Sequence, residues 1–499
     1  MVAGAIDIPQ RPATQAQGTQ DSSDIDAVHV AVTAARAAQP GWEALGFEGR
    51  ARYMQSVLAL LIENQEAYLD IFREETGRSD AESTMLEILP TADSLAYYSK
   101  RAKKLLADER PSLHLLKMKK VVIRHRPLGV IGIITPWNAP FTLGSDAVVQ
   151  ALMAGNSVVL KPSEVTPRSG GLIGELFAEA GLPEGVLSVV QGDGRVGAAL
   201  VDAGVDKISF TGSVKTGRKV GEACGRNLIS CTLELGGNDA CIVCADAPLT
   251  RAASGVVFGA FMNSGQACLG VERVYVVDEV ADEFIERTVD VVRQLRLGSV
   301  GQYDQGRMIW EPQLAIIERH VADAIARGAK LLVGGKRSEE HGPLFYEPTV
   351  LTDVTHEMAI MREETFGPVL AIMRVGSEGE ALELANDSQY GLSGTIWTRD
   401  KRRALELAKG MDTGSVCIND SSVTPGIHEI PFGGRKQSGL GHNHGPDGLK
   451  GFCFPQPVVL DRFVLDSEMV WYPHAADTKD KLQGAVKWLF GSRLGRRLL

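Results

Sequence analysis

The chain has 499 residues, of which 44% are hydrophobic and 23% charged, an ordinary composition for two or three globular domains. A formal net charge of −10 and a pI near 5.6 argue against a polyanionic partner, so we expect no nucleic-acid binding. Residues 1–20 lack the pattern of a secretory signal, and no apolar run has membrane-spanning length. The seven cysteines, an odd number, favour reduced thiols and a cytoplasmic protein.

The predicted elements begin with helices. Residues 1–23 are polar and rich in Gln, Ser, Thr and Pro, so we expect an arm there. Helical periodicity follows to about residue 75 with a break at Pro40-Gly41, and a third helix is expected at about 80–106. A short strand is expected at 121–125.

From residue 130 the sequence alternates between apolar strands and helices of about 10–14 residues. The expected strands are 130–134, 157–161, 187–190 and 207–210, and the expected helices are 144–154, 168–180, 195–203 and 214–224. A second series of the same kind runs from about 239 to 445. This alternation predicts an α/β fold with buried parallel sheets.

The tail from residue 471 to 499 places basic residues around apolar ones at helical spacing. The basic residues are Lys479, Lys481, Lys487, Arg493, Arg496 and Arg497, and the apolar ones are Leu482, Val486, Leu489 and Phe490. We expect a C-terminal helix that packs on the body or on a neighbouring subunit. Contact of a basic amphipathic helix with an anionic membrane surface is the alternative.

Three segments are candidates for nucleotide binding. Residues 192–197 read G-x-G-x-x-G between a strand and a helix, but no acidic residue ends the next strand, and turn geometry alone explains such glycines. Gly212 and Ser213 end a strand and open a helix, whose N-terminus favours an anion. Lys161 and Glu164 follow a strand end and could bind ribose or phosphate, or remain solvated loop charges.

Two residues are candidates for covalent and acid–base chemistry. Glu234 stands between an apolar strand and a Gly-Gly turn, so burial should raise its pKa toward that of a general base; a hydrogen-bonded structural role is the alternative. Cys268 ends a glycine-containing loop and could attack a carbonyl as thiolate, although a lone cysteine is more often inert core. Cys241 and Cys244 lie in an apolar strand and are interpreted as core.

Asn138 lies between two prolines after a predicted strand. Its amide could be a preorganised oxyanion donor, or it could only close the turn. For metals the sequence is poor: His442 and His444 form the only close histidine pair, and no carboxylate or cysteine accompanies them at ligand spacing. We therefore expect no metal site.

Taken in order, these motifs resemble the aldehyde dehydrogenase superfamily from about residue 11 to 470. The matching segments are TPWNAPF, AGNSVVLKPSEVTP, ISFTGSVKTGRKV, ELGGNDACIV, NSGQACLGVER, EETFGPVL and PFGGRKQSGLG. The resemblance implies that Cys268 is the nucleophile, Glu234 the general base, and Asn138 the oxyanion-hole amide beside the backbone N–H of Cys268. It also implies a set of cofactor contacts, namely Thr135, Pro136, Trp137, Lys161, Ser163, Glu164, Gly194, Gly212, Ser213, Leu235, Glu364 and Phe366.

Within that set, the resemblance gives Lys161 and Glu164 to the adenosine ribose, Gly212 and Ser213 to the pyrophosphate, and Glu364 and Phe366 to the nicotinamide side. The cofactor would bind in a modified Rossmann manner, with residues near Gly192 on the adenine side. Because the carboxylate of Glu164 would repel a 2′-phosphate, we expect NAD rather than NADP.

The resemblance further implies an oxidoreductase that converts an aldehyde to its acid through a thiohemiacetal and a thioester. Glu234 would activate the hydrolytic water, and its presence favours hydrolysis over transfer to coenzyme A. The implied domains are an NAD-binding domain (1–108 and 129–236), a catalytic domain (237–445), a small β oligomerisation element (109–128 and 446–470) and the tail (471–499). A homodimer or homotetramer is expected.

Where many relatives have large aromatics after the position of Asn138, this chain has Ala139, Leu143 and Asp146. These residues predict a roomier pocket, with one carboxylate, for a bulky or polar aldehyde. Alternatively, Asp146 caps or pairs on its own helix. The sequence leaves open a semialdehyde, fatty or aromatic aldehyde as substrate, and a non-catalytic structural relative is the alternative from a different class.

Overall fold

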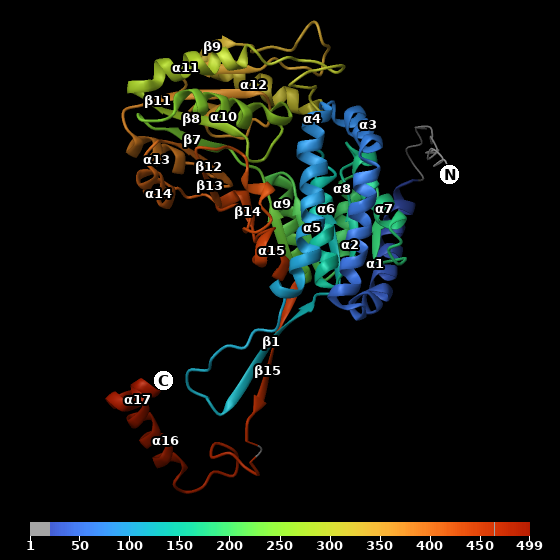
Figure 1. The fold of residues 1–499 in the computed structure, drawn as a ribbon, viewed down its shortest axis with the longest axis vertical. Coiled ribbons are helices and arrows are strands. Elements are labelled where there is room, and N and C mark those ends of the chain that lie inside the picture. The colour runs from blue at the N-terminus through green and yellow to red at the C-terminus, as the bar shows by residue number, and fades with distance from the viewer. Residues whose placement is uncertain (1–19, 464) are drawn as a thin grey trace.

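The computed structural model describes residues 20–463 and 465–499, so most of the predicted N-terminal arm lies outside the described residues. Figure 1 shows two α/β bodies, a two-stranded ribbon that projects from them, and a helical tail beyond the ribbon. The first helix already includes residue 20, so the last residues of the predicted arm are helical.

The first body is built around a six-stranded sheet in the order β14-β6-β5-β2-β3-β4. Its strands are β2 (Val130–Ile134), β3 (Ser157–Lys161), β4 (Leu187–Val189), β5 (Lys207–Thr211), β6 (Ser230–Glu234) and β14 (Gly439–Leu440). All neighbours are parallel except β14, which pairs antiparallel with β6. The predicted buried parallel sheet is therefore confirmed, because strands buried on both faces carry almost continuous apolar runs.

Helices cover both faces of this sheet and bury its two cores. They are α1 (Gln20–Ala44), α2 (Gly46–Glu63), α3 (Gln65–Thr76), α4 (Asp80–Ser83), the π turn η1 (Thr84–Ile88), α5 (Leu89–Leu105), α6 (Thr142–Ala154), α7 (Pro167–Glu179), α8 (Gly194–Asp202) and α9 (Val214–Asn227). One core joins the sheet to α2, α3, α5, α6 and α7, and the other joins it to α1, α8 and α9.

The predicted helix break at Pro40-Gly41 is wrong, because α1 continues through Pro40 to Ala44. Pro40 lies near the end of the helix, and the turn that follows it is fixed by tertiary contacts. Trp42 is buried, and its indole Nε1 donates a hydrogen bond to the carbonyl of Leu152 at 2.9 Å. The chain turns instead at Gly46, whose φ of 67° suits glycine.

The second body contains a seven-stranded sheet in the order β13-β12-β7-β8-β11-β10-β9. Its strands are β7 (Asp239–Val243), β8 (Val271–Val277), β9 (Lys330–Val333), β10 (Thr349–Thr352), β11 (Val369–Val375), β12 (Ser393–Trp397) and β13 (Ser415–Ile418). Its helices are α10 (Leu249–Phe261), α11 (Asp278–Val292), α12 (Pro312–Ala326), α13 (Glu378–Asn386) and α14 (Lys401–Gly410), with the short turns η2 (Met262–Gly265), η3 (Ala359–Met361), η4 (Thr424–Gly426) and η5 (Lys436–Ser438).

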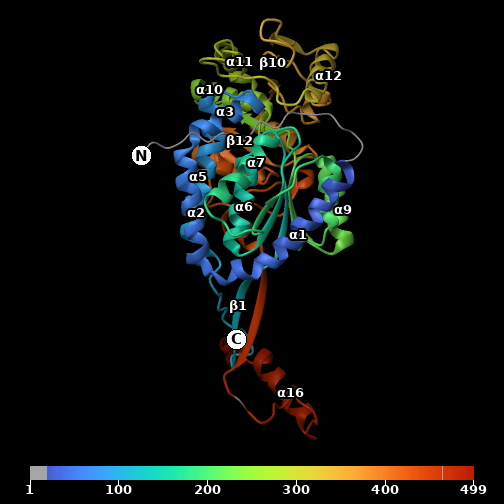
Figure 2. The same cartoon turned by 90° about the vertical axis from the view of Figure 1, so that its right-hand side faces the viewer.

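The last part of the chain returns to the first body and then leaves it. After β14 and α15 (Gly445–Lys450), β15 (Cys453–Asp461) pairs antiparallel with β1 (Lys119–Pro127), in a register from Lys119 opposite Asp461 to Pro127 opposite Cys453. Figures 1 and 2 show this ribbon extending away from both sheets.

The tail forms α16 (Thr478–Val486), the π turn η6 (Lys487–Gly491) and α17 (Arg493–Leu498). Both views place it around the outer end of the ribbon, away from the two bodies, so the helix forms as predicted but does not pack on the body of its own chain. Throughout the described ranges, no helix combines the length and apolar character that a membrane crossing requires.

Candidate active site

The predicted cofactor residues gather at the carboxyl edge of the first sheet. From β2 the chain proceeds outward through β3 and β4, then crosses to the opposite side of β2 to form β5 and β6. Open α/β sheets bind ligands in the crevice at such a switch in strand order. Thr135–Asn138 follow β2, Lys161 ends β3, and Gly212 and Ser213 follow β5, so these residues border that crevice.

The turn between β5 and α9 has the structure of an anion-binding helix start. Ser213 is the N-cap residue of α9, and its side chain accepts a hydrogen bond from the backbone N–H of Thr216. The backbone N–H of Gly212 donates to the carbonyl of Glu234 at 3.0 Å, which fixes the turn against β6. Since the first amides of a helix point toward an anion, this turn fits the pyrophosphate of a dinucleotide.

The end of β3 presents a buried cation and an exposed carboxylate together. The Lys161 side chain is 5% exposed, and its Nζ lies 2.9 Å from Oε2 of Glu164, whose side chain is 52% exposed. Such a pair supplies one donor and one acceptor at a single point, as recognition of a ribose hydroxyl requires. Ser163 is buried between them, and its Oγ accepts a hydrogen bond from the N–H of Val165.

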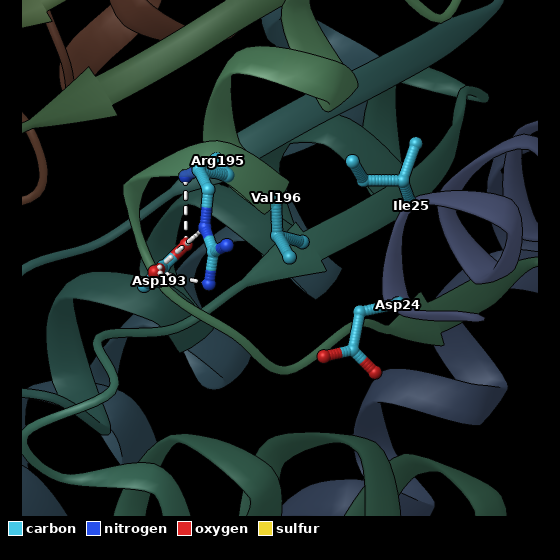
Figure 3. Close-up of a pocket in the computed structure, with 5 residues that line it drawn as sticks. All are labelled: Asp24, Ile25, Asp193, Arg195 and Val196. Atoms are coloured by element: carbon cyan, nitrogen blue, oxygen red, sulfur yellow. Dashed lines mark hydrogen bonds and ion pairs between the residues drawn. The ribbon is translucent and has the colours of Figure 1, made fainter. Parts of the chain in front are cut away.

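The glycine motif at 192–197 forms a helix start whose N-cap is already an anion. Gly194 begins α8, and the Asp193 side chain accepts a hydrogen bond from the N–H of Arg195 at 2.8 Å. Asp193 also pairs with the Arg195 guanidinium. The carboxylate therefore occupies the position that a phosphate would take at this helix start. The glycine motif thus fits the adenine side of a dinucleotide better than its pyrophosphate. Figure 3 shows the hollow at this point, lined by Asp24, Ile25, Asp193, Arg195 and Val196.

An aromatic and carboxylate group lies on the other side of the crevice. The rings of Trp137 and Phe366 meet edge to face with centroids 5.4 Å apart. Oε1 of Glu364 accepts a hydrogen bond from the N–H of Gly237 at 2.9 Å, and a Cβ at Gly236 would lie 2.2 Å from its other oxygen. Only glycine fits there, so the turn after Glu234 and the Glu364 loop are packed directly together.

The remaining predicted cofactor residues are backbone elements of the same edge. The N–H of Thr135 donates to the carbonyl of Lys161 at 3.1 Å, which extends the β2–β3 pairing by one bond. Pro136 follows it and is partly exposed. The N–H of Leu235 donates to the carbonyl of Ser438 at 2.8 Å, and its side chain fills the space beside Gly217 on α9.

The loop before Cys268 is strained and heavily hydrogen-bonded. Asn263 and Ser264 both have a φ of 55°, a left-handed conformation that is costly for residues other than glycine. The Asn263 amide donates to the carbonyls of Asn138 at 2.9 Å and Gln266 at 3.0 Å. Such strain persists only where surrounding contacts fix the backbone, as they do here.

These contacts bring Asn138 to the Cys268 loop. Nδ2 of Asn138 donates one hydrogen bond to the carbonyl of Gln266 at 3.0 Å, two residues before the cysteine. A side-chain amide has two N–H groups, so the second remains for another acceptor. Asn138 is 7% exposed, and a buried, oriented amide is the kind of donor that an oxyanion hole needs.

Cys268 packs against the apolar side chains of Leu269, Leu392 and Phe432 and is itself partly exposed. Desolvation raises the pKa of its thiol, and so do the nearby carboxylates, those of Glu364, Asp239 and Glu234. The thiol is therefore protonated in this state of the protein, and reaction with a carbonyl requires that its proton be removed.

Glu234 ends β6 and lies near enough to this thiol to raise its pKa, in a site with few polar neighbours. Its side chain is buried, and neither carboxylate oxygen has a close hydrogen-bond partner among the described residues. Burial raises the pKa of Glu234 well above its usual range, against an opposing contribution from the backbone of Asn443. A carboxyl group with a raised pKa beside a thiol can accept a proton from water or from the thiol.

Two buried carboxylates that the sequence analysis missed hold this site in place. Glu272 in β8 accepts hydrogen bonds from the N–H groups of Thr365 and Phe366 and from the amide of Asn238. Glu82 in α4 accepts one from the N–H of Asn263. The adjacent charged residues Glu272 and Arg273 within the buried strand β8 were an available signal, whereas Glu82 is joined to the site only by the fold.

Asp146 lies on α6 next to this centre but is engaged with other polar groups. Its carboxylate accepts hydrogen bonds from Ser94 Oγ at 2.6 Å and from the Gln150 amide at 2.8 Å, and His444 Nε2 lies 2.7 Å away. Burial would raise the pKa of Asp146, but His444, His428 and Ser94 together hold it at about 2. The pairing on its own helix through Gln150 is thus present, along with partners from outside the helix.

Comparison with known proteins gives this fold and site a class. The Aldehyde dehydrogenase family matches residues 9–458. The 4,4′-diapolycopene aldehyde oxidase of Methylomonas sp is 39% identical over 467 residues, which cover 92% of this chain and 86% of that protein. A Mycolicibacterium smegmatis protein with the provisional name succinate-semialdehyde dehydrogenase (NADP+) is 40% identical over 440 residues, covering 87% of this chain and 84% of that protein.

Solved structures give the same class as the sequence relatives. The aldehyde dehydrogenase of Mycobacterium tuberculosis complexed with NAD+ superposes with a TM-score of 0.84 at 35% identity, covering 88% of this chain and 92% of that chain. The lactaldehyde dehydrogenase of Escherichia coli gives a TM-score of 0.84 at 34% identity, covering 88% and 91% of the two chains. The chain belongs to the aldehyde dehydrogenase family. It is an oxidoreductase that converts an aldehyde to the carboxylic acid with a nicotinamide dinucleotide as oxidant.

Proposed function

We propose that Cys268, Glu234 and Asn138 carry this reaction on a neutral, predominantly apolar aldehyde. The observation that supports these roles is their convergence from three segments: Asn138 is bonded to the Cys268 loop, and Glu234 raises the pKa of the Cys268 thiol. The Cys268 sulfur adds to the carbonyl carbon, and the second N–H of Asn138 stabilises the oxyanion. A nicotinamide dinucleotide held at the carboxyl edge of the first sheet would supply the hydride acceptor.

Glu234 acts twice in this scheme. It takes the proton of the Cys268 thiol, directly or through water, and after oxidation it removes a proton from the water that hydrolyses the thioester. A raised pKa suits both steps, because the carboxylate must hold a proton at one stage and release it at another. The acid product then leaves, and the free thiol is restored.

The choice of an apolar aldehyde rests on the surroundings of Cys268. Leu269, Leu392 and Phe432 pack against it, while Glu364, Asp239 and Glu234 are the acidic groups that act on its thiol. A substrate with a carboxylate close to the aldehyde would lose its hydration there without gaining a cationic partner, because the side chains that surround the thiol are apolar or acidic. The relative named as an aldehyde oxidase of a diapolycopene supports an extended apolar substrate, and the one named for succinate semialdehyde supports the anionic alternative.

The test is reduced-cofactor formation across a panel of aldehydes with Cys268→Ala and Glu234→Gln as variants. We expect linear apolar aldehydes to have a kcat/KM at least about tenfold above that of succinate semialdehyde, a difference of ~1.4 kcal/mol. Cys268→Ala should abolish turnover. Glu234→Gln should lower turnover by about 10²–10⁴, because both proton transfers lose their base. Preference for the anionic semialdehyde would refute the substrate assignment, and turnover by Cys268→Ala would refute the mechanism.

For the cofactor we propose NAD rather than NADP. The exposed carboxylate of Glu164, fixed by Lys161, can accept hydrogen bonds from ribose hydroxyls and repels a 2′-phosphate. In this proposal, the twelve residues given above as cofactor contacts line the crevice at the carboxyl edge of the first sheet. Glu164→Gln keeps the side-chain shape and removes the charge, so we expect it to raise kcat/KM for NADP relative to NAD by about tenfold. Glu184→Gln, an exposed change outside the crevice, serves as the control.

We propose that the ribbon and tail join a second copy of the chain in a dimer or tetramer. An isolated two-stranded ribbon is marginally stable in water, and this one exposes Phe454, Val459 and Leu460. The exposed Trp471, Tyr472, Trp488 and Phe490 of the tail continue this apolar surface. In this proposal residues 1–108 and 129–236 bind the cofactor, 237–445 supply the catalytic cysteine, and 109–128 and 446–470 join subunits. The seven free thiols support a cytoplasmic location.

A further inference from the structure

A buried group of two imidazoles and a carboxylate lies beside the reaction centre and has no role in the proposed reaction. Donor atoms of Asp146, His428 and His444 all lie within 4.8 Å of one another. The three residues come from separate segments: α6, the loop after η4, and the residue before α15. α15 packs against α5 and α6, as Figure 1 shows, so the fold itself brings them together.

His428 has a ring nitrogen prepared for a ligand. Its Nε2 lies 3.1 Å from the carbonyl of Pro90, which can only accept, so Nε2 carries a proton and Nδ1 is the nitrogen that can offer a lone pair to a ligand. The side chain is 2% exposed, and this Nδ1 has no hydrogen-bond partner among the residues that the structure describes. It lies 3.7 Å from Oδ1 of Asp146, close enough for one ion to bridge both atoms.

The carboxylate opposite is held as a metal-bound carboxylate is held. Ser94 Oγ donates to Oδ1 of Asp146 and the Gln150 amide donates to Oδ2, which fixes the plane of the group. His444 Nε2 lies 2.7 Å from Oδ2. Hydrogen bonds from neighbours to ligating carboxylates, and from ligating histidines to backbone carbonyls, are what orient the ligands of protein metal sites.

We propose that Asp146, His428 and His444 form a binding site for one divalent transition-metal ion, with Zn²⁺ the best fit. Nitrogen and oxygen donors in this ratio suit zinc, and three protein ligands leave a fourth position for water. Bonds of about 2.0–2.2 Å in a tetrahedron place donor atoms roughly 3.3–3.6 Å apart. The separations of 3.7 and 2.7 Å lie on either side of this value, so small side-chain rotations reach it.

The surroundings also provide a route for the ion. The carboxylate of Asp93 lies 3.7 Å from His428 Nε2, and its side chain is 56% exposed. A solvent-facing carboxylate beside an otherwise buried site attracts a cation and gives it a first partner. The chain as a whole has a formal net charge of −10, which acts in the same direction.

The site is structural in this proposal, and it bears on the substrate pocket. The His444 and Phe432 rings lie 5.9 Å apart between centroids, and Phe432 packs with Cys268. An ion bound to His444 and Asp146 would tie the loop that carries Phe432 to α6. It would therefore fix one wall of the acyl pocket without touching the reacting atoms.

The test uses untagged, full-length protein in a Cys268→Ala background, which removes the reactive thiol as a competing ligand. The protein is treated with a chelator and then titrated with Zn²⁺ by calorimetry and with Co²⁺ by visible absorption. We expect one ion per chain, a Co²⁺ spectrum without a thiolate charge-transfer band, and a raised melting temperature. Ser94→Ala should weaken binding by about 10–100-fold, and Asp146→Asn or His428→Ala by more.

The chain offers a matched control. Cys244, Asp246 and Glu378 form a second, half-buried group of potential ligands, and Asp246→Asn should leave the titration unchanged. If His428→Ala fails to fold, as judged by circular dichroism, Asp146→Asn and Ser94→Ala still decide the matter because both keep the packing. Absence of saturable binding, a thiolate band in the Co²⁺ spectrum, or undiminished binding by Asp146→Asn would each overturn the proposal.

Discussion

Three carboxyl groups and a thiol share a space of low polarity at the reaction centre. Burial raises the pKa of Glu234, Glu364 and Asp239 well above their usual ranges, and the same surroundings raise that of Cys268. Like charges in such a place cannot all be ionised, so one proton lost by the thiol is readily gained by a neighbouring carboxyl. The raised pKa values thus indicate that the three carboxyl groups and the thiol stay protonated until substrate and cofactor are bound.

Asn138→Ala tests the oxyanion donor at the scale of one residue. We expect kcat to fall by about 10²–10³, because one preorganised donor is lost in the transition state, while the KM for the cofactor changes little. Steady-state kinetics with one aldehyde measures both. Asn227→Ala is the matched control, since that amide also donates to a backbone carbonyl but far from the site. An unchanged kcat in Asn138→Ala would exclude the oxyanion role.

The strained turn η2 depends on a carboxyl group from a distant helix. Glu82 in α4 accepts from the N–H of Asn263, and burial raises the pKa of Glu82 to about 7, although the Asn263 N–H and Arg78 oppose the shift. Since its pKa is raised in the folded state, the stability that Glu82 contributes is fully present below the pKa of the unfolded chain. It is lost as the pH rises from about 4.5 through 7.

Glu82→Gln should therefore change how stability depends on pH. The amide imitates the protonated carboxyl, so we expect the variant to match the parent at about pH 4 and to exceed it by about 3 kcal/mol near pH 8. Urea unfolding at a series of pH values measures this difference. Glu63→Gln, at an exposed position of α2, should show a constant difference across the same range. A Glu82→Gln curve parallel to that of the parent would contradict the assignment.

At this scale the sequence predicted regular elements better than the contacts between them. Strands such as 130–134 and 157–161 were predictable because burial on both faces demands continuous apolar residues. The helix through Pro40 was not, because its continuation depends on Trp42 reaching the carbonyl of Leu152. The contact of Glu82 with the Asn263 turn was equally unpredictable, since nothing near Glu82 in sequence indicates that α4 would lie against that turn.

For the site, the resemblance in motifs predicted the individual residues but not the residues that contact them in the fold. Asn138, Glu234 and Cys268 each stand at the end of a predictable element, so their convergence at one edge followed from the parallel sheet. His444 was judged with its sequence neighbour His442, yet in the fold it meets His428 and Asp146. Ligand groups assembled from three distant segments leave no spacing pattern that a single sequence reveals.

The whole molecule has an exposed extension that association with a second copy would bury. Val459→Asp, on the exposed face of the ribbon, should weaken self-association by at least about tenfold because it places a charge in an apolar contact. Sedimentation velocity measures the change, and Val30→Asp on α1, also exposed but far from the ribbon, is the control.

Removal of residues 471–499 should likewise weaken association and leave the per-site rate unchanged. Co-sedimentation with vesicles containing anionic lipid distinguishes the alternative. If the full chain binds them, the truncated chain does not, and association is unaffected, then the tail serves a membrane surface instead.

The strand β14 has a consequence for how the molecule is made. It pairs Gly439 with Glu234 and Leu440 with Leu233, so the outer edge of β6 stays uncovered until the whole second body has been synthesised. A nascent chain thus carries an open strand edge next to Glu234, the proposed general base, while the second body is made. Premature termination before β14 would leave that edge available to other chains. Glu234 therefore receives its final neighbours only after β14 has been made, which ties the proposed chemistry to prior synthesis of the second body.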